Sequence, residues 1–191
     1  MLRILVIDEL APRADEICAG LAAAGHAVAA LLPNCTDLTH QVEVHRPDVI
    51  LIQCDAPSRG MLEHLAVINA AAPRPVLLFA RRGDARQMRK AIQAGVSAYV
   101  VDGLQRERVP ALVELAIARF EEHEDLKHER DEATHKLAER KLIDRAKGVL
   151  MKARGLDEEA AYAALRKLAM DRAQPLGKAA ADVIEMAKVL L

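Results

Sequence analysis

The sequence predicts an α/β fold in which a five-stranded, doubly wound parallel sheet is followed by a long connector helix and a C-terminal three-helix bundle. Three observations favour this fold class. Short apolar runs rich in β-branched residues alternate with helical stretches over residues 1–120, which is typical of parallel strands covered on both faces. No Pro or Gly occurs between Pro110 and Gly148, which favours one long helix. Amphipathic segments with helical periodicity end the chain.

Strands and helices are expected to alternate along the first part of the chain. The expected strands are the apolar runs at residues 2–7, 26–32, 48–52, 75–79 and 98–101. The expected helices between them cover residues 12–24, 36–45, 60–71 and 85–94. Gly25 and Gly95 follow two of these helices, where glycine is a common termination signal. A fifth helix follows Pro110.

Charge and apolar spacing divide the whole chain into three expected parts. These are a sheet domain over residues 1–120, a helical connector over residues 121–137 and a helical bundle over residues 138–191. Along the connector, Leu126, Ala133 and Leu137 follow near-heptad spacing, but charged residues interrupt the apolar seam. The pattern predicts either a solvent-exposed connector or a weak coiled coil. We expect a homodimer, at least in the active state.

The composition limits the possible functions. The net charge is −1, so any affinity for nucleic acid must come from a local patch. No run approaches the roughly 18 apolar residues of a membrane span, and the N-terminus lacks a signal-peptide pattern. Cys18, Cys35 and Cys54 are odd in number and widely spaced, which fits reduced thiols rather than disulfides or a zinc site. We therefore expect a cytoplasmic protein without a membrane span, metal or cofactor.

Residues 141–154 form the predicted helix that carries the candidate binding site. Its apolar stripe, read at helical period, consists of Leu142, Ala146, Val149, Leu150 and Ala153. Cations and one glycine occupy its other sides, namely Lys141, Arg145, Lys147, Gly148, Lys152 and Arg154. A residue without a side chain amid cations lets a phosphate backbone approach closely. A solvated charged face on a small bundle is the alternative interpretation.

The following helix contributes weaker candidates. Arg166 and Lys167 lie outside its apolar stripe, so they either contact nucleic acid or simply face solvent. Tyr162 falls in the stripe, and we expect it in the core rather than as a stacking platform for a base.

Polar residues gather where the expected strands end. Working groups of a doubly wound sheet lie in the crevice beyond the carboxyl ends of the strands. The residues at this edge are Asp8, Glu9, Gln53, Ala80 and Asp102. No glycine-rich phosphate loop occurs at a strand-to-helix turn, so a nucleotide site is unsupported. No nucleophile, base and oxyanion donor converge at any loop, which argues against an enzyme.

Both halves of the chain resemble known families. The first 120 residues resemble the receiver domain of response regulators. The matching segments are the run Ile4 to Glu9, the expected third strand Asp48 to Gln53, and the segment Ala94 to Tyr99 that leads into the expected fifth strand. The last 55 residues resemble the ANTAR domain, an RNA-binding antitermination module. The matching runs are Ile143 to Met151, Glu159 to Tyr162 and Leu165 to Met170. The whole looks most like the nitrate-assimilation regulators of the NasT type.

The receiver resemblance implies a pocket that has lost its chemistry. The phosphoryl-accepting aspartate of the family falls on Gln53, its hydroxyl switch falls on Ala80, and its lysine falls on Asp102. Only Asp8 and Glu9 remain, either as a residual metal site or as inherited loop acids, and two carboxylates alone bind Mg²⁺ weakly. Asp55 is a possible substitute acceptor beyond the strand end. We expect a pseudo-receiver that is switched by a partner rather than by phosphate.

The ANTAR resemblance implies a function and partners. The resemblance implies that the protein binds paired hairpins of leader mRNA and so prevents a terminator from forming. On this interpretation, the cations of residues 141–154 are expected to contact the RNA. The resemblance to NasT-like systems also implies a partner, namely a nitrate-sensing protein that resembles periplasmic binding proteins. A DNA-binding response regulator and a protein-interaction adaptor are the alternatives.

Overall fold

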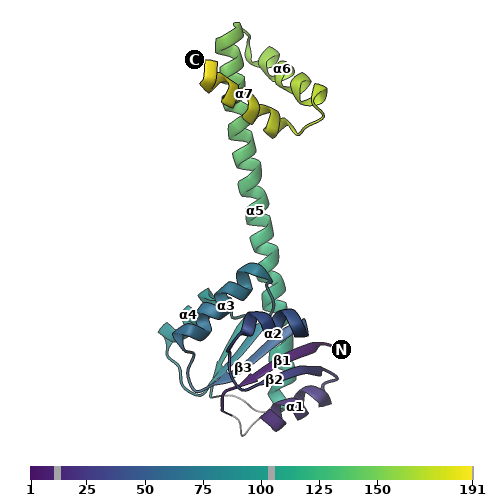
Figure 1. Ribbon diagram of the computed structural model, residues 1–191, viewed down its shortest axis with the longest axis vertical. Coiled ribbons are helices and arrows are strands. Elements are labelled where there is room, and N and C mark those ends of the chain that lie inside the picture. Colours follow the sequence, from purple (N-terminus) through teal and green to yellow (C-terminus); the bar gives the residue numbers. More distant parts are fainter. Residues whose placement is uncertain (11–13, 103–105, 191) are drawn as a thin grey trace. The chain divides into compact units, whose positions relative to one another are not determined.

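The computed structural model describes residues 1–10, 14–102 and 106–190. The chain forms two compact units, Met1–Glu124 and Asp125–Leu191 (Figure 1). Each unit has its own hydrophobic core. The predicted domain limits at residues 120/121 and 137/138 stay predictions, and both fall within one long helix.

The first unit is built on a parallel sheet, as predicted. Its strands are β1 (Arg3–Asp8), β2 (Ala27–Leu32), β3 (Val49–Cys54), β4 (Val76–Ala80) and β5 (Ala98–Val101). Their order is β2-β1-β3-β4-β5, and all neighbours are parallel. The central strands run one or two residues further than expected, because the ladder continues into the pairs Asp8↔Gln53 and Cys54↔Ala80. Three of the predicted pocket positions are therefore fixed by the sheet itself.

Helices cover both faces of the sheet. They are α1 (Ala14–Ala23), α2 (Leu38–His45), α3 (Arg59–Ala71) and α4 (Ala85–Gln93), and the 3₁₀ turn η1 (Arg106–Arg108) leads into α5 (Val109–Arg154). Leu65 of α3 and Ala91 of α4 pack in the core on one face, together with α2. Ile17 of α1 and Val113 of α5 pack on the other face. The doubly wound arrangement is confirmed, while the expected helix start at Pro12 lies outside the described residues.

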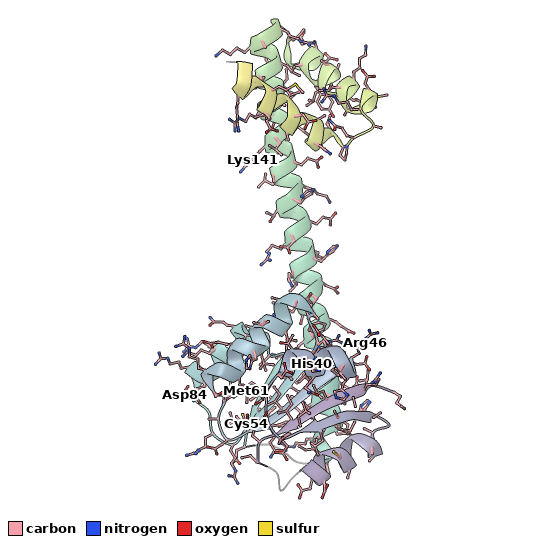
Figure 2. All side chains as sticks on the ribbon, in the orientation of Figure 1. His40, Arg46, Cys54, Met61, Asp84 and Lys141 are labelled. Atoms are coloured by element: carbon pink, nitrogen blue, oxygen red, sulfur yellow. The ribbon has the colours of Figure 1, made fainter. Side chains whose placement is uncertain are left out.

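Local side-chain contacts define where two of these helices begin. The Ser58 hydroxyl accepts the Met61 N–H at 3.1 Å, which caps α3. Asp84 and Gln87 form a reciprocal capping box at the start of α4, and Figure 2 shows Asp84 at this end of the helix.

The second unit packs the last turns of α5 against α6 (Glu158–Asp171) and α7 (Leu176–Leu190), as Figure 1 shows. The core residues come from all three helices and include Ala146 of α5, Leu165 of α6 and Ala180 of α7. Asp157 caps α6 by accepting the Ala160 N–H at 2.7 Å.

The apolar stripe predicted for residues 141–154 is partly wrong. Leu142 is 38% exposed, whereas its neighbour Ile143 packs against the core. Ile143, Ala146 and Leu150 lie at i, i+3 and i+7, which is one helical face, and Leu142 lies about 100° away from Ile143 around the axis. Ala153 is also exposed, because α5 ends there at Arg154. Among the described residues, no helix combines the length and hydropathy needed to cross a bilayer.

Candidate nucleic-acid interface

Four of the predicted cations are exposed on the last turns of α5. They are Lys141, Arg145, Lys152 and Arg154, and Figure 2 shows Lys141 projecting from the helix. None of the four forms an ion pair within the described residues, so their charge is not neutralised there. Uncompensated surface cations on one helix are suited to contact phosphates.

Gly148 lies among these cations without a local reason for being glycine. Its backbone is helical and does not have a positive φ. A Cβ added at this position meets no atom of the described residues within 4 Å. Glycine in a helix interior costs roughly 0.5–1 kcal/mol relative to alanine, so the intramolecular packing of this unit does not account for it. The bare stretch of backbone leaves room for a molecule from outside.

Lys147 differs from the other cations. Its ammonium lies 2.8 Å from Asp144 Oδ1 and 2.8 Å from Glu158 Oε1, and only 15% of the side chain is exposed. The hydrogen bond to Asp144, and to a smaller extent the one to Glu158, raises the pKa of Lys147. Its role as an RNA contact stays a prediction, but the structure assigns its ammonium to a link between α5 and α6. The partner Glu158 was not foreseen from the sequence.

On α6, the predicted cations are exposed and the predicted core position of Tyr162 is wrong. Arg166 and Lys167 both face solvent. Tyr162 is 43% exposed, because Ala161 and Leu165 take the buried positions of this helix. Tyr162 and Arg166 are one helical turn apart and therefore neighbours on the surface.

The degenerate pocket lies at the carboxyl edge of the sheet. Asp8 and Gln53 are each 4% exposed, and Asp8 Oδ1 accepts the Leu10 N–H at 2.9 Å. Asp8 Oδ2 and Gln53 Oε1 are buried without a hydrogen-bond partner in the described part of the chain. Glu9 is exposed, and partial desolvation raises the pKa of its carboxyl group. Nothing in this set supplies a buried positive charge.

The other two pocket positions follow the neighbouring strands. Ala80 is buried at the end of β4 and offers no hydroxyl. Asp102 is exposed, has a positive φ of 49° and donates its N–H to the Ala80 carbonyl at 2.9 Å. No three His, Cys, Asp or Glu side chains of the described residues group as a metal site.

Asp55 comes directly after β3 and is tied to the loop that follows β4. Its carboxylate pairs with the Arg82 guanidinium, and its carbonyl accepts the Arg82 N–H at 2.9 Å. The hydrogen bond from Arg82 lowers the pKa of Asp55. Arg82 is 27 residues away in the sequence, and no local pattern pointed to it.

Comparison with known proteins identifies the C-terminal unit. Residues 131–191 match the family model of the ANTAR domain. This segment is an ANTAR domain. Over 183 residues the chain is 25% identical to the transcriptional regulatory protein PdtaR of Mycobacterium tuberculosis, an alignment that spans 96% of this chain and 89% of the relative. A 55-residue stretch is 49% identical to the nitrate regulatory protein of Klebsiella oxytoca and spans 29% of this chain and 12% of that protein.

Solved structures show the fold that precedes the ANTAR domain. The chain is similar to the CheY-like response regulator receiver domain protein of Methanospirillum hungatei, with a TM-score of 0.56 at 15% identity. The match spans 64% of this chain and 98% of that chain. The chain thus carries an ANTAR domain that follows a receiver-like α/β unit, and the relatives named above are a transcriptional regulatory protein and a nitrate regulatory protein.

Proposed function

We propose that this protein is an RNA-binding antiterminator, which binds paired hairpins in leader mRNA and so prevents transcription termination. The observation that carries the proposal is the exposed cationic face of α5 in the ANTAR domain, where Arg145 and Lys152 flank the bare backbone of Gly148. These residues lie at i, i+3 and i+7, so they share one side of the helix.

RNA recognition accounts for this combination better than a generic charged face. Phosphate contacts need free cations, and Arg145 and Lys152 have no ion pair within the described residues. Sequence-specific readers of RNA mostly bind unpaired loops, whose backbone and bases are accessible to a helix surface. Lys141, Arg154, Arg166 and Lys167 are assigned to the same interface as further phosphate contacts.

A homodimer fits two hairpins. Leu126 and Leu137 are 59% and 56% exposed on α5, eleven residues apart and therefore on nearly the same side of the helix. Exposed leucines in this register support pairing of two copies along α5, with one ANTAR domain for each hairpin. Charged residues between the leucines keep the pairing weak, so that RNA binding contributes to it.

Control is assigned to a sensor protein rather than to phosphorylation. Gln53 and Ala80 cannot take up or sense a phosphoryl group, and Asp55 is engaged by Arg82. The 55-residue stretch that is 49% identical to a nitrate regulatory protein supports nitrate- and nitrite-assimilation genes as the target. We assign a nitrate-sensing partner on the same ground, and action on nascent transcripts implies a cytoplasmic protein.

Incubation with acetyl phosphate should leave the protein unlabelled, and stoichiometric label on Asp55 would contradict this mode of control.

A competition experiment tests the function. Purified full-length protein is incubated with a labelled two-hairpin leader RNA and challenged with unlabelled duplex DNA at several stated salt concentrations. The proposal expects the RNA to remain bound at salt concentrations where duplex DNA does not compete. Displacement by DNA would favour a DNA-binding regulator, and absence of binding to either would favour a protein-interaction adaptor.

A further inference from the structure

A groove lies beside the α6–α7 turn of the ANTAR domain. It has a volume of about 470 Å³ and is lined by Tyr162, Arg166, Met170, Ala173, Pro175 and Leu176, among others. Ligand sites in proteins typically measure roughly 300–1,000 Å³. Met170 is 70% exposed and Tyr162 is 43% exposed, so two large apolar side chains of this groove are accessible to solvent.

The turn that forms one end of the groove is held in place by its own contacts. The Gln174 N–H reaches back to the Ala169 carbonyl at 3.0 Å, and Ala173 has a positive φ of 47°. Asp182 of α7 accepts hydrogen bonds from Gln174 Nε2 at 3.0 Å and from Arg172 at 3.4 Å. These contacts hold the turn that closes one end of the groove.

The chemistry of the lining indicates the kind of ligand. An aromatic ring and a guanidinium lie one turn apart on α6, and the described residues that line the groove include no carboxylate. Asp182, which is close by in the fold, is already engaged by Gln174 and Arg172. A ligand suited to this set has a flat apolar part and a negative charge beside it. An unpaired nucleotide, with its base and its phosphate, has both.

We propose that this groove receives one unpaired base of the hairpin loop, which stacks on Tyr162 while Arg166 contacts its phosphate. This inference rests on the proposed function and adds a base-reading position to it. The cations of α5 hold the backbone without regard to sequence, whereas a base in the Tyr162 groove makes binding depend on the loop.

The test uses full-length protein and a hairpin RNA selected by the wild-type protein from a pool with a randomised loop. Each loop base is then replaced in turn by an abasic nucleotide, and by 2-aminopurine to report stacking. Tyr162→Leu should weaken binding about ten- to hundred-fold, as loss of a base–aromatic stack does, whereas Tyr162→Phe should bind within about twofold of wild type. Met186→Ala, which removes a 45% exposed side chain of α7 outside the groove, should have no effect.

The variant and the RNA series together locate the contact. At one loop position, the abasic RNA should bind wild type and Tyr162→Leu equally, and 2-aminopurine there should be quenched by wild type and Tyr162→Phe only. If wild type binds the hairpin and Tyr162→Leu binds it as tightly, the groove does not read a base and the inference is overturned, while the proposed function stands. If wild type selects no hairpin at all, the proposed function itself fails.

Discussion

Lys147 of α5 and Glu158 of α6 form an ion pair in which Nζ lies 2.8 Å from Oε1. The same ammonium lies 2.8 Å from Asp144 Oδ1, one turn earlier on α5. The pair joins the helix that carries the candidate phosphate contacts to the helix that carries Tyr162. It therefore fixes the relation between two surfaces that we assign to RNA.

Removing this link should destabilise the ANTAR domain in a pH-dependent way. The hydrogen bond to Lys147 lowers the pKa of Asp144 from its ordinary 3.8, so its contribution to stability is present above pH 3.8 and is lost as the pH falls through the lowered value. Lys147→Met should lower the Tm near neutral pH, and the Tm values of variant and wild type should converge in acid.

Circular dichroism melts of the full-length protein at a series of pH values measure this effect. The matched control is Lys136→Met, which removes a lysine from an exposed i,i+4 pair with Glu132 and should change the Tm much less. A Tm difference for Lys147→Met that does not vary with pH would rule out the ionic explanation.

Replacing Gly148 by Ala should separate stability from binding. A Cβ here meets nothing within 4 Å, so the variant should be more stable by about 0.5–1 kcal/mol. RNA affinity should fall, because the added methyl group occupies the closest approach to α5. Urea unfolding and RNA titration of the same variant measure the two effects. Gly177→Ala is the control, since its Cβ would lie 2.8 Å from the Glu139 side chain and bring no such gain.

If Gly148→Ala gained stability and bound RNA like wild type, the bare backbone at this position would have no part in recognition.

Restoring a carboxylate at Gln53 should make stability depend on a divalent cation. Asp8 and Gln53 are in register on adjacent strands, and each is 4% exposed. Gln53→Asp therefore buries a second carboxylate and should cost roughly 2 kcal/mol or more of unfolding free energy. Millimolar Mg²⁺ should recover part of this loss in the variant and leave the wild-type Tm unchanged.

Thermal melts with Mg²⁺ and with EDTA provide the comparison. A wild-type Tm that rises with Mg²⁺ as much as that of the variant would show that Asp8 and Glu9 are a working metal site, against our interpretation.

The buried cysteines should be inert. Desolvation raises the pKa of both Cys35 and Cys54 to about 12, so neither thiol forms thiolate near neutral pH. Cys18 is partly exposed. Its pKa is also raised, first by partial burial and second by the negative charge of Asp15. Alkylation of native protein near pH 8, followed by mass spectrometry, should label Cys18 first and the other two only after unfolding. Rapid labelling of Cys54 in native protein would contradict the packing of β3.

The strands and most helices of this chain were predictable because they depend on local pattern. The five apolar runs identified all five strands of the described sheet. The carboxyl ends of β1 and β3 were predicted too early in the sequence. Asp8 and Gln53 belong to the sheet because they pair with each other across the two strands, which the local pattern does not show.

The candidate site was predictable as a helix with a cationic face, but not in its tertiary contacts. The partner of Lys147 on α6 is eleven residues away, and that of Asp55 is 27 residues away. Helical period places Tyr162 at the edge of the apolar stripe, and packing of Ala161 and Leu165 against the other helices decides that its ring is exposed. Such choices depend on how neighbouring helices meet, which no single-helix pattern contains.

The most direct test of the central claim is the equilibrium affinity of full-length Arg145→Glu for a leader hairpin RNA, measured against wild type over a range of salt. Arg145 is exposed and has no ion pair in the described part of the chain, so it should account for at least one phosphate contact. The variant should therefore bind more than about tenfold more weakly and with a shallower salt dependence. Charge reversal at the exposed Arg89 of α4 should leave both quantities unchanged. Wild-type affinity and salt dependence in Arg145→Glu would contradict the account.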